Sequence, residues 1–169
     1  MPLKTESDWE RLAYKWMDKC EDEIKSWKGL GCFSLGLFKL DWSVRRRSSR
    51  GGIYGTLPGI NIAMQIACTE YSVVSRVYEY KSFDRDRIIG GFYYCDADLK
   101  LGLHVCHEMA HAVQFYRKFV LNDDSYDKPH GESFKKPYRV LRTKILNPLL
   151  EPQEPLKLEY ESFIKKYNK

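Results

Sequence analysis

Two histidines and a glutamate in residues 107–111, which read His-Glu-Met-Ala-His, carry the most specific chemistry in this chain. They lie in a longer run, 99–115, whose apolar residues recur with the period of a helix. Residues four apart on a helix lie about 6 Å from each other on one face, so His107 and His111 can reach one metal ion while Glu108 faces its water. The alternative interpretation is an ordinary helix with two partly buried histidines and a surface glutamate. We interpret the pentad as the metal site of a hydrolase, with Glu108 as general base.

A third metal ligand is expected after this helix, because a catalytic zinc ion takes three protein ligands and keeps an open position for water. His130 is the candidate, since the polar loop at 122–126 lets the chain reverse and lay a second helix beside the first. His104 is an alternative that lies near the face of His111, but a separation of about 10 Å along the axis is too long for both to bind one ion. We predict one Zn²⁺ per chain, held by His107, His111 and His130, with His104 in a supporting or core position.

The pentad and residues 128–134, Lys-Pro-His-Gly-Glu-Ser-Phe, together resemble the SprT-like metalloproteases, a family that includes the Spartan protease. In that family an HExxH helix is followed by a short loop and by His-Gly-x-x-Phe or Trp at the start of another helix. The segment 49–64 is similar to the glycine-marked strand pair that precedes this helix in the family. The resemblance covers residues 30–145 and implies a zincin-like α+β fold, a protein or peptide substrate, and contact with DNA. It also implies zinc as the cofactor, with His107, His111 and His130 as ligands and Glu108 as catalytic base.

The chain departs from the family in its cysteines. Many bacterial members end in a cysteine-based zinc ribbon, whereas the five cysteines here form no C-x-x-C pair and predict no second, structural zinc. An odd number of scattered cysteines is typical of free thiols in a reducing compartment. They are Cys20, Cys32, Cys68, Cys95 and Cys106.

The expected mechanism is metal-assisted hydrolysis of a peptide bond. Glu108 takes a proton from the water that zinc activates and later delivers it to the leaving amine. Tyr138 and Arg139 follow the third ligand closely, and either could donate a hydrogen bond to the oxyanion. The far nitrogens of the ligand imidazoles also need carboxylate or carbonyl partners. The candidate partners are Asp96, Asp98 and Glu132.

The elements before the pentad are expected to form a helix and a small antiparallel sheet. A helix is predicted over 9–27, with Asp8 as its cap and one buried apolar face. Strand-like runs follow at 32–46, 53–55 and 60–64, with a turn signal at Leu57-Pro58-Gly59. An edge strand of such a sheet can pair with an extended peptide and guide it to the metal.

The segment 66–96 is harder to interpret. Residues 71–80 fit either a strand or a short helix, and 81–87 has the polarity of a loop. A β-run over 88–94, interrupted by two glycines, would bring Asp96 or Asp98 to the cap of the pentad helix, which should end near Phe119.

The region after His130 predicts a helix over 132–146, with Pro137 near its first turn. The core-facing positions of this helix are Phe134, Tyr138, Leu141 and Ile145. Residues 147–155 have the composition of a Pro/Glu linker, and 156–167 that of a short amphipathic tail. We therefore predict a catalytic domain over 1–146 and a linker with a helical tail over 147–169.

The formal net charge of +5 is spread unevenly along the chain. One basic cluster is a candidate nucleic-acid contact, and an ordinary solvated basic surface explains it equally well. The cluster consists of Arg45, Arg46, Arg47 and Arg50. A second group of basic residues follows His130. No apolar leader or span of 18 apolar residues is present, so we expect an intracellular protein outside membranes. The oligomeric state is left open.

Three functions fit these observations. The first is a small zinc-dependent endopeptidase that acts on proteins held on DNA, as the family resemblance implies. The second is a non-proteolytic module, in which a structural zinc site stabilises a domain that binds nucleic acid or a partner protein. The presence of Glu108 argues against it, because a structural site is closed by a fourth ligand. The third is a zinc hydrolase acting on a non-peptide amide or on a peptide cross-link of a cell wall.

Overall fold

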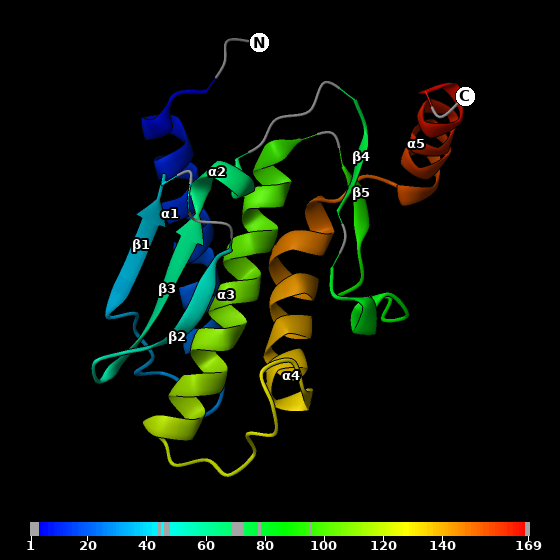
Figure 1. Cartoon of the computed structure of the whole chain (residues 1–169). Coiled ribbons are helices and arrows are strands. Elements are labelled where there is room, and N and C mark those ends of the chain that lie inside the picture. The colour runs from blue at the N-terminus through cyan, green and yellow to red at the C-terminus, as the bar shows by residue number, and fades with distance from the viewer. Residues whose placement is uncertain are drawn as a thin grey trace.

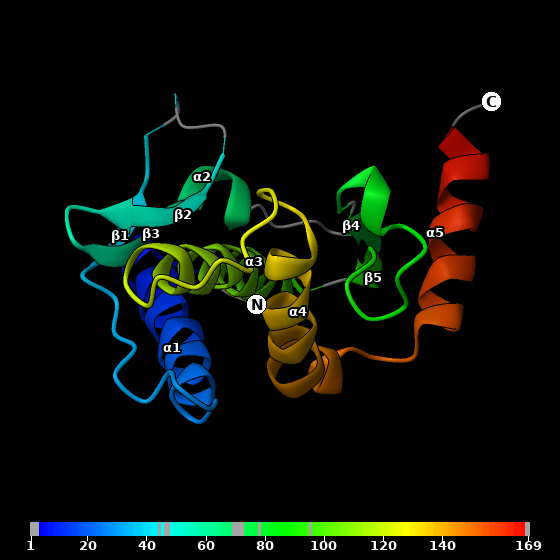
Figure 2. The ribbon, with the colours of Figure 1, turned by 90° about the horizontal axis from the view of Figure 1, so that it is seen from below.

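The computed structural model describes residues 4–43, 45, 48–68, 73–77, 79–94 and 96–167, and it has a mixed α+β fold rich in helix. The long helix α3 (Ala97–Phe119) runs through the middle, between a three-stranded sheet and helix α4 (Glu132–Leu141) (Figure 1). Seen from below, the sheet, α3, α4, a two-stranded sheet and α5 (Gln153–Tyr167) follow one another across the molecule (Figure 2). The pentad helix is therefore flanked on opposite sides by the elements that complete its site.

Helix α1 (Glu6–Lys25) packs on α3 and supplies much of the core. The Thr5 side chain accepts a hydrogen bond from the Asp8 N–H, and the Asp8 carboxylate accepts one from the Thr5 N–H. This is a capping box, so the prediction of Asp8 as the cap was wrong: Asp8 is the third helical residue. A Cβ on Gly102 of α3 would lie 2.6 Å from the Trp16 ring, so this glycine lets the indole pack against α3. The buried face of α1 consists of Trp9, Ala13, Trp16, Cys20 and Ile24.

The three-stranded sheet consists of β1 (Leu37–Asp41), β2 (Arg50–Tyr54) and β3 (Leu57–Ala63), in the order β1-β3-β2. Strands β2 and β3 form an antiparallel hairpin, and Gly55 in its turn has a φ of +68°, which favours glycine. Strand β3 pairs with β1 in parallel, so the predicted antiparallel pairing is confirmed for β2 and β3 and wrong for β1. The chain reverses before β2 and again at the hairpin, and β3 therefore runs in the same direction as β1.

The smaller sheet pairs β4 (Ser75–Val77) with β5 (Phe92–Tyr94) in antiparallel fashion. A strand is therefore present within 71–80, although residues 71, 72 and 78 lie outside the described ranges. The 3-10 turn η1 (Lys81–Phe83) lies between the two strands. The predicted run over 88–94 becomes a strand only at Phe92, because the Asp86 carboxylate accepts the N–H groups of Ile88 and Ile89 and holds a turn there.

Helix α3 begins and ends where the sequence predicts. Asp96 is its N-cap, and the Asp96 side chain accepts the N–H of Asp98, so Asp96 is the cap of the two candidates. The helix ends at Phe119. Most of its residues from Leu101 to Gln114 are buried, because the sheet, α1 and α4 all contact this one helix.

The second helix is shorter than predicted. Helix α4 ends at Leu141, and a π-helical turn, η2 (Arg142–Leu146), continues the chain. Pro137 is the sixth residue of α4, so its predicted place in the first turn was wrong, and the helix lacks a hydrogen bond to the Ser133 carbonyl. The predicted core positions are confirmed, since all four are buried: Phe134, Tyr138, Leu141 and Ile145.

A 3-10 turn, η3 (Asn147–Leu149), leads to α5, which begins at Gln153 and has no buried residue. The Gln153 side chain accepts from the N–H of Tyr93 and donates to its carbonyl, which ties the start of α5 to β5. The division at residue 146 stays a prediction. Within the described ranges, no helix has the length and apolar character needed to cross a membrane.

Candidate metal centre

The three predicted histidine ligands converge on one point. The Nε2 atom of His130 lies 3.0 Å from Nε2 of His111 and 3.3 Å from Nε2 of His107. His107 and His111 are buried and His130 is half-buried. All three ligand nitrogens lie within 4.8 Å of one another, close enough to hold a single metal ion. Over the described residues, no fourth His, Cys, Asp or Glu joins this group.

Gln114 sets the proton position on His111. Its amide nitrogen donates to the Lys128 carbonyl at 2.8 Å and to Ser133 Oγ at 2.7 Å, so its amide oxygen faces Nδ1 of His111 at 3.3 Å. Since that oxygen only accepts, Nδ1 of His111 carries the proton and Nε2 keeps a lone pair. The same side chain therefore orients one ligand and fixes the loop that presents His130.

Glu79 orients the His107 ring, as Gln114 orients that of His111. Its carboxylate oxygen lies 3.7 Å from Nδ1 of His107, with its side chain 5% exposed. The Tyr138 hydroxyl donates to Glu79, and the Arg142 guanidinium lies 3.7 Å from it. Burial opposes ionisation of Glu79, but contacts with His107, Tyr138 and Arg142 together lower its pKa below the ordinary value. An ionised Glu79 favours a proton on Nδ1 of His107 and leaves Nε2 free to bind metal.

None of the three carboxylates predicted to support the ligands does so. Asp96 caps α3, the Asp98 carboxylate accepts from the Trp16 indole, and Glu132 pairs with Lys135 and Arg139. The supporting partners are Glu79 and Gln114, which sequence reasoning missed. Gln114 does lie three residues after His111, so helical spacing was a signal for it, whereas Glu79 had none.

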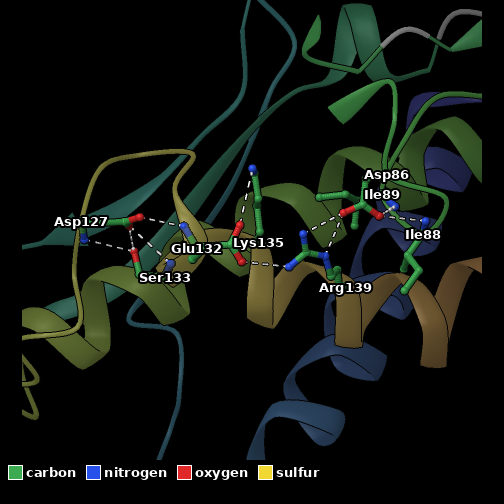
Figure 3. A network of polar contacts seen from close by, with 8 residues as sticks. All are labelled: Asp86, Ile88, Ile89, Asp127, Glu132, Ser133, Lys135 and Arg139. Atoms are coloured by element: carbon green, nitrogen blue, oxygen red, sulfur yellow. Dashed lines mark hydrogen bonds and ion pairs between the residues drawn. The ribbon is translucent and has the colours of Figure 1, made fainter. Parts of the chain in front are cut away.

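Asp127 positions the loop that carries His130 (Figure 3). Its carboxylate accepts from the N–H of Glu132 at 2.7 Å and from the Ser133 hydroxyl, which caps the start of α4. These bonds hold the pKa of Asp127 well below its ordinary value, with the Ser133 hydroxyl as the largest cause. A Cβ on Gly131 would overlap this carboxylate, so a larger residue there would push Asp127 out of its hydrogen bonds to the start of α4.

The same polar network continues along α4 to the segment after η1. Arg139 donates to Glu132 at 3.0 Å and reaches Asp86 with two nitrogens at 2.8 Å (Figure 3). Asp86 in turn accepts from the N–H groups of Ile88 and Ile89. The loop of His130 and the segment that follows Glu79 are thus joined through one face of α4.

The donor set fits a bound metal ion. Nitrogen ligands of a tetrahedral zinc lie about 3.3 Å apart, and Nε2 of His130 lies 3.0 and 3.3 Å from Nε2 of His111 and His107. Without a cation, Nε2 of His107 and Nε2 of His111 both present a lone pair to Nε2 of His130. A neutral His130 has at most one proton on that nitrogen, so it can donate a hydrogen bond to only one of the two. Burial and neighbouring histidines lower the pKa of His111 to about 3 and that of His130 to about 4, so both rings are neutral and available at pH 7.

Glu108 lies beside the ligands in a cleft of about 520 Å³ that His107, Glu79 and Tyr80 also line. It is 7% exposed and does not belong to the metal-ligand group. Strand β2 packs directly over it: a Cβ on Gly51 would clash with the Glu108 carbonyl oxygen and lie 2.8 Å from Cβ of His111. A carboxylate that lines a cleft and stays outside the ligand group can exchange a proton with a water or a substrate atom.

The two residues nominated to stabilise an oxyanion have other partners. Tyr138 is fully buried and its hydroxyl donates to Glu79, while Arg139 pairs with Asp86 and Glu132. Neither lines the cleft. Tyr80 does line it, with its ring centroid 4.0 Å from that of His130 and 5.6 Å from that of His107.

His104 lies outside the ligand group and lines the cleft one turn before Glu108. Burial is the largest cause that lowers its pKa to about 4, and Lys100 and His107 add to it. A neutral His104 agrees with the supporting or core position expected for it.

Two arginines of the predicted basic cluster are exposed near residues that line the cleft. Arg45 and Arg50 are exposed, and Ser48 and Ser49, between them in sequence, line the cleft. The prediction of a nucleic-acid contact at Arg46 and Arg47 falls on residues outside the described ranges.

Comparison with protein-family models, with curated proteins and with solved structures finds no match to this chain.

Proposed function

We propose that this chain is a zinc-dependent endopeptidase of the SprT-like type, with a zincin-like catalytic domain over residues 1–146. The main observation behind the proposal is the convergence of three imidazole Nε2 atoms, together with a cleft that is lined by one of these histidines, His107, and by Glu108. When bound, zinc would bring the pKa of a water toward neutrality and polarise the scissile carbonyl. His107, His111 and His130 would hold it.

Glu108 is the proton carrier in this proposal. It accepts a proton from the attacking water and returns it to the leaving amine, so that one carboxylate serves as base and then as acid. Its position supports this role, because it lines the cleft next to His107 while staying outside the ligand group. Glu79 and Gln114 hold the ligand rings in the tautomer that binds metal.

The shape of the cleft favours a peptide substrate. Lys100, His104 and Glu108 line it at successive turns of α3, which places its ends about 12 Å apart along the helix. This length takes three to four residues of an extended chain at roughly 3.3 Å each. Strand β2 is an edge strand of the sheet and packs over Glu108 through Gly51, so we propose that it guides the peptide.

The number of ligands supports catalysis over a structural staple. A closed structural zinc site has four protein ligands, and the part of the chain that the structure describes supplies three to this site. A carboxylate outside the ligand group, in the cleft that His107 also lines, fits a peptidase, in which it serves as the base. For this reason we place the peptidase first.

DNA-held proteins are the substrates we propose, as the SprT-like resemblance implies. Arg45 and Arg50 are exposed on either side of Ser48 and Ser49, which line the cleft. A phosphate backbone bound by these arginines would hold an attached protein close to Glu108.

Cleavage of an unfolded protein tests the proposal. The zinc-loaded chain is incubated with denatured casein, alone and with single- or double-stranded DNA, beside Glu108→Gln. We expect the wild-type chain to cleave the casein, and Glu108→Gln to retain zinc and fold without cleaving. DNA binding should weaken steeply with salt and with Arg45→Ala/Arg50→Ala. Zinc-loaded wild-type protein that cleaves nothing under any of these conditions would contradict the peptidase proposal.

A further inference from the structure

Tyr80 packs against two of the three candidate ligand histidines. Its ring is stacked with that of His107 at 5.6 Å and lies 4.0 Å from that of His130. It lines the same cleft as Glu108, and 49% of its surface is exposed. The Tyr80 ring therefore contacts two candidate ligands and also lines the space that a substrate would fill.

The backbone around Tyr80 is anchored on both sides. The preceding residue, Glu79, is held by His107, Tyr138 and Arg142. The Tyr80 carbonyl accepts the N–H of Phe83, and the two rings meet edge to face at 5.5 Å. A half-exposed side chain on a backbone fixed this way is positioned in advance of substrate binding, which electrostatic stabilisation of a transition state requires.

The other candidate donors are less suitable. The hydroxyl of Tyr138 is buried and engaged by Glu79, and Arg139 is paired outside the cleft. Tyr94 lines the cleft, but its ring packs edge to face on Phe92 at 6.1 Å. Tyr80 is the phenol that combines the cleft with the ligand face.

We propose that the Tyr80 hydroxyl donates a hydrogen bond to the oxyanion that forms on the scissile carbonyl, a role that rests on the proposed peptidase activity. Water adds to the carbonyl carbon, its proton passes to Glu108, and the π-electron pair of the C=O bond moves onto oxygen. Tyr80 stabilises that negative charge and keeps its own proton, because an ordinary phenol is neutral at pH 7. When the tetrahedral species collapses, the C–N bond breaks and Glu108 protonates the amine.

The expected signature is a loss in kcat with little change in KM. A bond made only to the oxyanion is absent in the ground-state complex, so removing it lowers kcat and kcat/KM together. Removal of one such donor costs about 10²- to 10³-fold in kcat. Tyr80→Phe keeps the ring that packs on His107 and His130, and zinc content and unfolding midpoint should therefore stay at wild-type values.

The test compares Tyr80→Phe with Tyr14→Phe in the zinc-loaded chain. Tyr14 lies on α1 with 47% exposure and packs edge to face on Phe38, so it is a control of matched exposure outside the cleft. Steady-state cleavage of a fluorogenic peptide is measured for each, together with binding of a phosphinic peptide, whose tetrahedral anion resembles the transition state. Tyr80→Phe should lose kcat and phosphinate affinity by similar factors, while Tyr14→Phe loses neither.

Two contrary results have different meanings. If the wild-type chain cleaves the peptide and Tyr80→Phe keeps at least half of its kcat, the role of Tyr80 is refuted and the peptidase proposal stands. If the wild-type chain neither cleaves peptides nor binds the phosphinate, the peptidase proposal fails and takes the role of Tyr80 with it.

Discussion

Replacing Gln114 by methionine should weaken zinc binding by about 10- to 100-fold, which is about 1.4 to 2.7 kcal/mol. Gln114 is 2% exposed and makes three contacts: with Nδ1 of His111 at 3.3 Å, with the Lys128 carbonyl at 2.8 Å and with Ser133 Oγ at 2.7 Å. Methionine fills a similar volume but makes none of these bonds. Two of the three ligands lose their orientation at once, His111 directly and His130 through its loop.

The same substitution should also destabilise the metal-free protein. Three hydrogen bonds at a net value of about 1 kcal/mol each predict a loss of about 2 to 3 kcal/mol in the free energy of unfolding. Zinc affinity is measured by competition with a chromogenic chelator, and stability by urea unfolding in EDTA. The two measurements separate an effect on ligand orientation from an effect on the fold.

Gln153→Met is the matched control for this prediction. Gln153 also bonds through both ends of its amide, to the N–H and the carbonyl of Tyr93, but it lies at the start of α5 and away from the histidines. Its replacement should lower stability and leave zinc affinity within twofold of wild type. The account of the metal centre is refuted if Gln114→Met binds zinc as tightly as wild type, or if Gln153→Met weakens binding equally.

Two further predictions concern the fit of β2 on α3 and the dependence on pH. Gly51→Ala should destabilise the fold and lower activity, because its Cβ would clash with the Glu108 carbonyl. Gly52→Ala is the control, since its Cβ would have nothing within 4 Å, and it should change neither stability nor activity. Urea unfolding measures the first quantity and a cleavage assay the second. In EDTA, the free energy of unfolding should fall as the pH drops from about 6.5 to 4. In the unfolded chain, His104 and His111 bind protons near pH 6.5. In the folded chain, burial lowers the pKa of His104 to about 4 and that of His111 to about 3, so acid favours the unfolded chain. The slope is about 1.4 kcal/mol per pH unit for each histidine, and urea midpoints that stay level across this window would contradict it.

The ligand set could be predicted from the sequence because it depends on local spacing. The four-residue interval from His107 to His111 fixes a shared face on any helix, and the polar loop before His130 allows one reversal. The structure brings these three side chains together, and Asp96 caps α3 as a short-range signal predicted.

The supporting residues could not be predicted, because they depend on packing between distant segments. Glu79 lies 28 residues before His107 in a stretch without clear periodicity, and its neighbours Tyr138 and Arg142 come from α4 and η2. The parallel pairing of β1 with β3 could not be predicted for the same reason. The alternation of apolar residues indicates which face of a strand is buried, but it does not indicate which strand lies beside it. Thr5 is a local signal for an earlier start of α1, because Thr5 and Asp8 are spaced as the N-cap and third helical residue of a capping box.

X-ray absorption at the zinc edge tests the central claim most directly. The measurement uses protein purified without a histidine tag and loaded with zinc, with His130→Ala and His104→Ala beside it. The account predicts about one zinc per chain with three imidazole nitrogens and one further oxygen at about 2.0 Å, lost on His130→Ala and kept on His104→Ala. A site with four protein ligands, or zinc binding that does not depend on His130, would contradict it.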